Sequence, residues 1–187
     1  MTQQVPAVDR DRVRQATRRI QAKLELEMSG LGADPTALAQ QAISQSGVDW
    51  LGQWLRPQIP PPPAIAVLFG AEWLKIESSR VKATFEPAEW MFNPFGAVYG
   101  GVIATPLDVV LGAAVHTALP TGTGYATSDL HVRYLRAITA STGRVLITGS
   151  VVHCGRRHAI AEARVTAEAT GKLLATATAD CAILRPS

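Results

Sequence analysis

The chain contains little cysteine and no large excess of one charge. Two cysteines in 187 residues exclude a disulfide-dense secreted scaffold and a four-cysteine zinc site. The formal net charge is only +3, and no long lysine- and arginine-rich block is present, so we expect no nucleic-acid partner. The N-terminus lacks an apolar run after a basic start, which predicts no signal peptide and a cytoplasmic protein.

Long uninterrupted apolar runs are also missing. The most apolar stretch, residues 98–119, contains a proline, an aspartate and a histidine, so we expect no membrane span. Hydrophobic residues nevertheless make up 47% of the chain and charged residues 18%, which is enough apolar side chain for a folded core. The length favours one domain with an appendage.

The composition changes near residue 60. Apolar spacing predicts helices near residues 13–24, 37–43 and 48–55, and prolines at 60–63 form a stiff spacer. We therefore predict an N-terminal helical extension with a proline-rich linker over residues 1–60 and a second domain over residues 61–187. The extension could cover the outer face of a sheet, lengthen a dimer contact or close a substrate tunnel.

The second part of the chain reads mainly as strands. Alternating or β-branched segments are found at residues 80–85, 126–135, 144–153, 158–167 and 173–184, and short turn sequences connect the later ones. One nearly all-apolar helix, from about residue 100 to 118, interrupts them and must be buried on most sides. The order predicts an α+β fold with an antiparallel sheet wrapped around one long buried helix.

A glycine-rich loop leads directly into this helix. Gly96, Gly100 and Gly101 allow close backbone approach to a ligand, and the free amides of a helix start suit a developing oxyanion. Asp108 lies about two turns into the apolar helix, where an unpartnered carboxylate is costly. Two interpretations stay open: a general base or nucleophile, or a structural acid that accepts hydrogen bonds from Thr105 or another hydroxyl.

These residues carry a resemblance. Asn93, Gly96, Tyr99, Gly100, Gly101 and Asp108 resemble the signature of the PaaI-like acyl-CoA thioesterases, Asn-x-x-Gly-x-x-His-Gly-Gly with an Asp nine residues after the His. Residues 127–136, Gly155-Arg156-Arg157 and residues 171–175 resemble later motifs of that family. The resemblance covers about residues 65–184 and implies a hotdog fold that hydrolyses acyl-CoA thioesters as a homodimer or homotetramer, without a metal or cofactor.

The resemblance also implies roles for the site residues. Asn93 and the Gly100 amide would hold the thioester carbonyl, Asp108 would activate water or attack directly, and Thr127 would lie near that water. The substrate would also contact Tyr99 and Gly101, while Gly155, Arg156 and Arg157 would contact the CoA nucleotide. In such enzymes the site lies at a dimer interface, so Asp108 would face Asn93 and Gly100 of the other subunit.

One position departs from the family pattern. Tyr99 replaces the usual His, and a phenol cannot titrate near neutral pH as an imidazole does. A non-catalytic acyl-CoA-binding or sensor protein is therefore the main alternative. A hotdog dehydratase or hydratase fits less well, because the Asp and His pair of those sites is not found in a matching context. We further expect His116 to cap the buried helix as a cation, and Trp73 and Trp90 to line either an acyl pocket or the core.

Overall fold

The computed structural model describes residues 11–12, 14–19, 22, 35–56 and 72–185. Residues 14–19 are helical, as the sequence predicts for this region, and they belong to a separate unit, Met1–Asp34. The prolines at 60–63 lie outside the described residues. The second unit, Pro35–Ser187, contains the glycine-rich loop, the apolar helix and all of the predicted strands.

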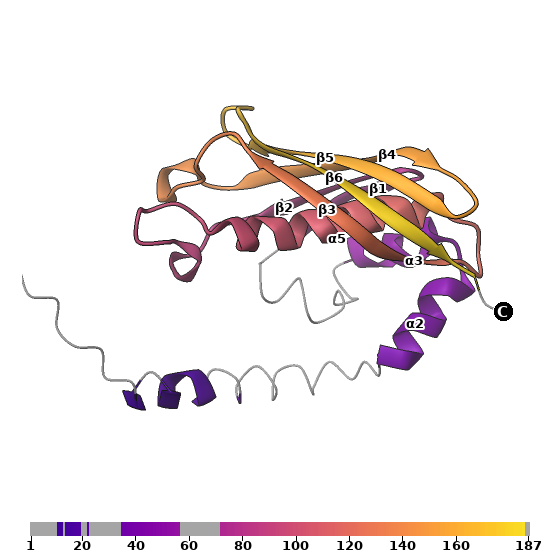
Figure 1. Cartoon of the computed structure of the whole chain (residues 1–187), viewed down its shortest axis with the longest axis horizontal. Helices are drawn as coiled ribbons and strands as arrows, with labels where there is room; N and C mark the ends of the chain where they lie inside the picture. The colour runs from indigo at the N-terminus through magenta and orange to yellow at the C-terminus, as the bar shows by residue number, and fades with distance from the viewer. Residues whose placement is uncertain (1–10, 13, 20–21, 23–34, 57–71, 186–187) are drawn as a thin grey trace, which may run out of the picture. The chain divides into compact units, whose positions relative to one another are not determined.

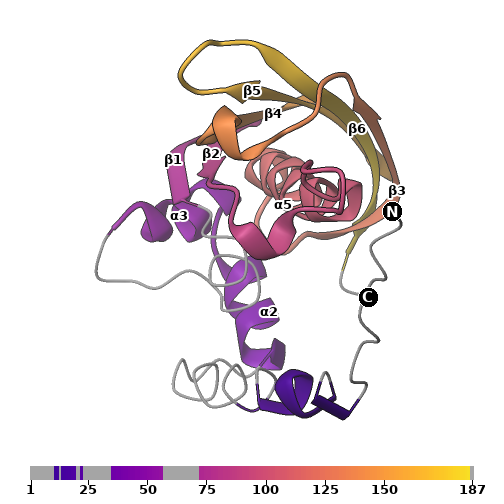
Figure 2. The same ribbon diagram turned by 90° about the vertical axis from the view of Figure 1, so that its left-hand side faces the viewer.

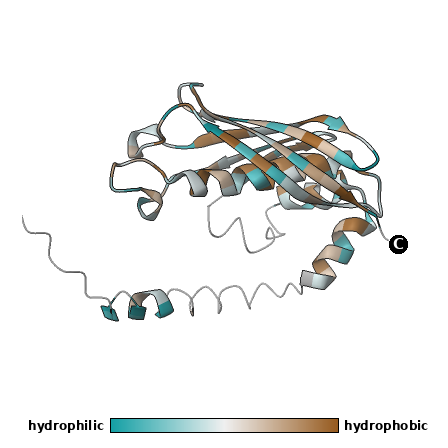
Figure 3. Ribbon diagram, viewed as in Figure 1, coloured by the Kyte–Doolittle hydropathy of each residue, from teal (hydrophilic) through white to brown (hydrophobic). Residues whose placement is uncertain are grey.

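One antiparallel sheet of six strands forms the body of this unit (Figure 1). Its strand order is β1-β2-β4-β5-β6-β3, which leaves β1 and β3 as the two edges. The strands are β1 Glu72–Glu77, β2 Arg80–Phe85, β3 Gly124–Tyr134, β4 Val145–Cys154, β5 His158–Ala167 and β6 Leu173–Leu184. The sequence predicted five of them, with β2, β5 and β6 correct to the residue, because hydrophilic and hydrophobic side chains alternate along the strands (Figure 3).

The long helix α5, Gly100–Ala118, lies in the concave face of this sheet, and the strands curve around it (Figure 2). α5 is long and apolar enough to cross a membrane, but most of it is buried against the sheet, as the core helix of this fold requires. Close approach is possible because the inner face of β5 carries small side chains and because Gly149 of β4 lies against the helix. An added Cβ at Gly149 would come within 2.8 Å of Val110 Cγ1. This arrangement confirms the predicted α+β architecture.

Two further helices precede the sheet. α2 spans Pro35–Ser44 and α3 spans Gly47–Gly52, followed by the short 3-10 helix η1, Gln53–Leu55. Ser46 caps α3 by accepting a hydrogen bond from the Asp49 N–H at 3.1 Å. α3 packs on α5 and β1, and Gly122 N–H bonds to the Ile43 carbonyl at 2.7 Å. These contacts place α2 and α3 in one compact unit with the sheet, on the helix side of the domain.

Candidate active site

The loop before α5 is organised by Asn93. Asn93 Oδ1 accepts hydrogen bonds from the backbone N–H groups of Phe95 and Ala97, at 2.9 and 3.2 Å. The Asn93 N–H donates to the Ala97 carbonyl at 2.8 Å, and Gly96 takes a positive φ of 75° in this tight turn. Asn93 therefore shapes the loop, in addition to any contact that it makes with a ligand.

The start of α5 presents free backbone donors. The N–H groups of Val102 and Ile103 donate to the Tyr99 carbonyl at 3.0 and 3.2 Å. Within the described residues, the N–H groups of Gly100 and Gly101 have no hydrogen-bond acceptor, as expected for the first turn of a helix. Tyr99 is half exposed and its side chain makes no capping bond. This end of the helix can therefore accept a carbonyl oxygen or an anion.

The Asp108 side chain is hydrogen-bonded to a residue of the neighbouring edge strand, β3. Thr127 Oγ1 donates a hydrogen bond to Asp108 Oδ1 at 2.9 Å. A β-bulge at Ser128 interrupts the pairing of β3 with β6 directly after Thr127, and such bulges re-aim side chains. Thr105, the other candidate donor, bonds instead to the Gly101 carbonyl at 3.0 Å. The structure thus brings Asp108 and Thr127 together as a pair.

The carboxylate and the free amides are not close to each other in one chain. Gly100 and Asp108 lie on the same helix, eight residues apart in the sequence. At 1.5 Å per residue, this separation is about 12 Å along the helix axis, too far for both to contact one carbonyl group. One copy of the chain therefore supplies two half-sites, the helix start and the Asp108–Thr127 pair.

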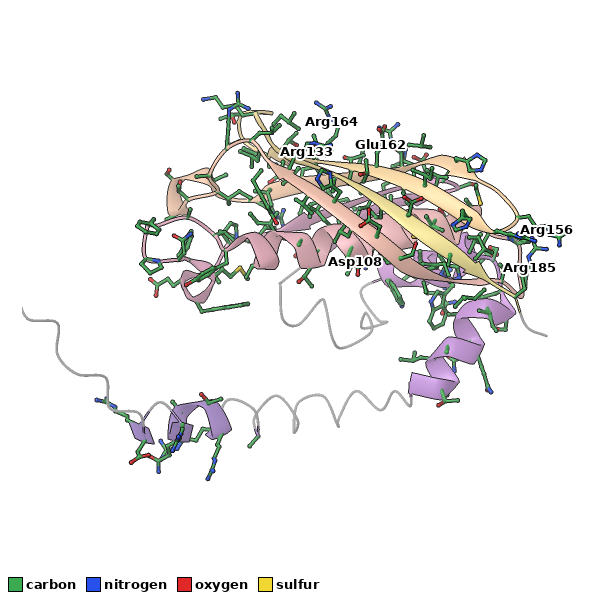
Figure 4. The ribbon with its side chains drawn as sticks, viewed as in Figure 1. Asp108, Arg133, Arg156, Glu162, Arg164 and Arg185 are labelled. Carbon is green, nitrogen blue, oxygen red and sulfur yellow. The ribbon has the colours of Figure 1, made fainter. Side chains whose placement is uncertain are left out.

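The predicted nucleotide-binding hairpin lies at one end of the sheet. Gly155, Arg156 and Arg157 connect β4 to β5, and both arginine side chains are exposed. The Arg157 carbonyl accepts a hydrogen bond from Ile183 N–H at 2.9 Å, so the hairpin lies beside the end of β6. Figure 4 shows Arg156 and Arg185 at this end, away from Asp108 near the middle of α5.

Known proteins share this arrangement. Residues 95–174 match the sequence model of the thioesterase superfamily. This part of the chain belongs to that superfamily. A protein of Halobacterium salinarum named as an esterase is 40% identical over 76 residues, which cover 40% of this chain and 48% of the relative. The chain thus spans about half the length of the curated relative that it matches.

Solved structures extend the likeness to the fold of the whole sheet-and-helix domain. A thioesterase-type protein of Ralstonia eutropha, related to phenylacetic acid degradation, is 27% identical with a TM-score of 0.62, covering 70% of this chain and 97% of its own. A Streptococcus mutans protein bound to acetyl-CoA is 25% identical with a TM-score of 0.56, covering 62% and 91%. The six-stranded sheet around α5 is the hotdog fold of these thioesterases.

Two tyrosines of the hotdog domain were not predicted as site residues. Tyr134 OH donates to the Gly100 carbonyl at 2.7 Å, and its ring lies against Gly100, where an added Cβ would be 3.1 Å away. Tyr125 places its hydroxyl over Gly112, 2.3 Å from the position of an added Cβ. Burial raises the pKa of Tyr125, so this phenol stays protonated and can donate. The sequence reading placed Tyr134 only within the strand predicted at residues 126–135, and that predicted strand begins one residue after Tyr125.

His116 does not act as the expected cationic cap of α5. Its Nε2 lies 3.1 Å from the Ala42 carbonyl of α2, and burial lowers the pKa of the imidazole. The neutral ring therefore joins α2 to α5 through a hydrogen bond.

Among the described residues, no group of three His, Cys, Asp or Glu side chains is arranged to hold a metal ion.

Proposed function

We propose that this chain is a PaaI-like acyl-CoA thioesterase, which hydrolyses an acyl-CoA to the free acid and CoA. The observation that carries the proposal concerns Asp108, which lies within the segment that matches the thioesterase superfamily. Its carboxylate accepts a hydrogen bond from Thr127 and lines an apolar cavity. The related Streptococcus mutans protein binds acetyl-CoA, which supports a CoA thioester as the substrate class.

The reaction needs one base and one oxyanion site. Water attacks the thioester carbonyl carbon, Asp108 takes the proton, and the Gly100 and Gly101 amides stabilise the negative oxygen. The C–S bond then breaks, and the proton passes to the CoA thiolate. Alternatively, Asp108 attacks the carbonyl itself and water hydrolyses the resulting anhydride. In a single turnover in ¹⁸O-labelled water, label in Asp108 establishes the anhydride route, because direct attack of water on the thioester places the label only in the product acid.

We propose that two copies complete each site. The 12 Å separation along α5 is bridged if the helix start of one subunit faces Asp108 of its partner, as in a two-fold dimer. β3 is an 11-residue edge strand with exposed side chains, and pairing it with a second β3 would cover that edge. Phe95 and Tyr99, 93% and 50% exposed, lie in the loop that would meet the partner.

The exposed hairpin offers a site for the CoA phosphates. Arg156 and Arg157 carry planar guanidinium groups that bind phosphate through paired hydrogen bonds, and Gly155 allows a close turn. We expect Arg156→Ala and Arg157→Ala to raise the KM for acyl-CoA several-fold with little change in kcat, because these contacts would form equally in the ground and transition states.

The first test is free-thiol release from acyl-CoAs by the wild type, Asp108→Asn and Glu162→Gln. Glu162 is an exposed residue of β5 on the outer face of the sheet, so its variant controls for loss of a charge (Figure 4). We expect Asp108→Asn to lose activity by about 10² or more and Glu162→Gln to match the wild type. Equal activity of the two variants would refute the role of Asp108.

The shared site has its own test. A mixture of Asn93→Ala and Asp108→Asn chains, co-refolded, should regain about a quarter of the wild-type activity, because half of random dimers carry one intact site of two. No recovery in dimers shown to exchange chains would overturn the two-copy site.

Tyr99 supports the alternative, an acyl-CoA-binding protein that does not turn over its ligand. Its phenol stands at the helix start with no capping bond, where the family pattern has His. Tight binding of acyl-CoA by an inactive wild type would favour this alternative. In that case Tyr99→His should create activity, because it restores a group that titrates near neutral pH.

A further inference from the structure

A cavity of about 830 Å³ lies between α5 and the N-terminal helices. α2 contributes Ala39 and Ile43, α3 contributes Trp50, and α5 contributes residues from Pro106 to His116. Asp108 and Thr127 also line the cavity, so it opens directly onto the proposed catalytic pair. The superfamily match begins only at residue 95, so the wall formed by α2 and α3 lies outside the matched segment.

Three tryptophan side chains, Trp50, Trp54 and Trp73, form an apolar part of the cavity wall. The Trp50 and Trp54 rings meet edge to face with centroids 5.6 Å apart, and Trp54 and Trp73 are 6.1 Å apart. Trp50 is only 8% exposed, so this group of three tryptophans is continuous with the hydrophobic core. An apolar pocket with a few polar groups at one end is typical of a site for an apolar ligand with a polar head.

The cavity follows the C-terminal half of α5. Its lining includes Asp108 and His116, eight residues apart on the helix. This distance is about 12 Å at 1.5 Å per residue. An extended chain advances about 1.2 Å per bond, as the polypeptide backbone does, so about ten bonds fit between the two ends. An acetyl group would leave most of this space empty.

We propose that the cavity holds the acyl chain, and that the substrates are acyl-CoAs with an unbranched apolar chain of about ten carbons. The thioester lies at Asp108, the chain runs along α5 toward His116, and α2 and α3 set its maximum length. This inference rests on the proposed thioesterase activity. Each methylene that enters the cavity should raise kcat/KM by roughly fourfold until the cavity is full.

The full-length protein can test this with a panel of straight-chain acyl-CoAs from two to sixteen carbons. The wild type should show its highest kcat/KM between eight and twelve carbons. Ala39→Trp places a large ring in the cavity from an exposed position of α2, and should lower the ratio of decanoyl to butanoyl kcat/KM by about tenfold or more. Gln41→Trp adds the same ring to an exposed position of α2 outside the cavity lining, and should keep the wild-type ratio.

The outcomes separate this inference from the proposed activity. A flat chain-length profile, or equal profiles of the two tryptophan variants, would overturn the acyl-pocket assignment and leave the thioesterase intact. No hydrolysis of any acyl-CoA would refute the activity instead. In that case the pocket assignment is tested by calorimetric binding of decanoyl-CoA to the Asp108→Asn protein. Tight binding that is weakened by adding Ala39→Trp, but not by adding Gln41→Trp, supports the acyl pocket. Equal affinities of the two tryptophan variants refute it.

Discussion

Gly47, the first residue of α3, is where the N-terminal helices press closely on α5. A Cβ added there would lie 2.2 Å from the His116 carbonyl oxygen, 2.5 Å from its carbon and 2.9 Å from Thr117 N. These are backbone atoms in the last turn of α5, so no side-chain rotation can relieve the overlap. Gly47→Ala must therefore displace α3 from α5.

The size of the effect depends on the side chains that α3 buries. Trp50 and Leu51 are 8% and 4% exposed, and full exposure of each would cost about 1.5–3 kcal/mol. Partial displacement, or overpacking without displacement, costs about 1–3 kcal/mol. Replacing glycine by alanine in a helix returns at most about 1 kcal/mol. We therefore expect Gly47→Ala to lower the free energy of unfolding by up to about 3 kcal/mol, or the Tm by up to about 12 °C.

Gly52 provides the matched control, because it ends the same helix and no atom lies within 4 Å of an added Cβ. Thermal unfolding followed by circular dichroism should leave Gly52→Ala at or slightly above the wild-type Tm. Tryptophan fluorescence should shift only in Gly47→Ala, because Trp50 becomes more exposed. Two variants of equal stability would refute the close contact of α3 with α5, and with it the cavity wall.

Three further predictions concern single side chains. Thr127→Val keeps the shape but removes the donor to Asp108, so kcat should fall about tenfold while the Tm changes little, measured by thiol release and thermal unfolding. Burial lowers the pKa of His116, so below about pH 6.5 the unfolded state binds more protons than the folded state, and the free energy of unfolding should fall as the pH decreases. His116→Gln should flatten this pH dependence, measured by urea titrations at several pH values. Asn93→Ala removes the acceptor of two backbone N–H groups, so the Tm should fall by several degrees and the rate of thiol release should drop. Asn93→Gln should not restore the turn.

Local pattern was enough to predict most of the fold. The alternation in β5 fixes its inner face, since Ala159, Ala161 and Ala163 are all buried. β1 was harder to define as a strand because a bulge between Trp73 and Lys75 breaks its alternation. Trp50 and Trp54 lie four residues apart, and their rings meet edge to face, as expected for residues on one helical face.

Contacts between distant segments could not be predicted in this way. The sequence marks Asp108 as unusual because this carboxylate lies in an apolar helix. The residues around Asp108 in the sequence do not indicate that Thr127 is its hydrogen-bond donor. The cavity is a similar case, because its walls come from helices and strands that are far apart in the chain. Side-chain periodicity reports which face of an element is buried, and does not report what that face meets.

The edge strand β3 connects the two half-sites of the hotdog domain. Tyr134 binds the Gly100 carbonyl, Thr127 binds Asp108, and Tyr125 lies over Gly112, so β3 runs antiparallel to α5 and contacts it at three points. The same strand that fixes the helix start and the carboxylate also carries the unpaired sheet edge. A second copy that pairs with this edge would therefore approach both half-sites at once, so the proposed interface would both complete the sheet and assemble the proposed catalytic group.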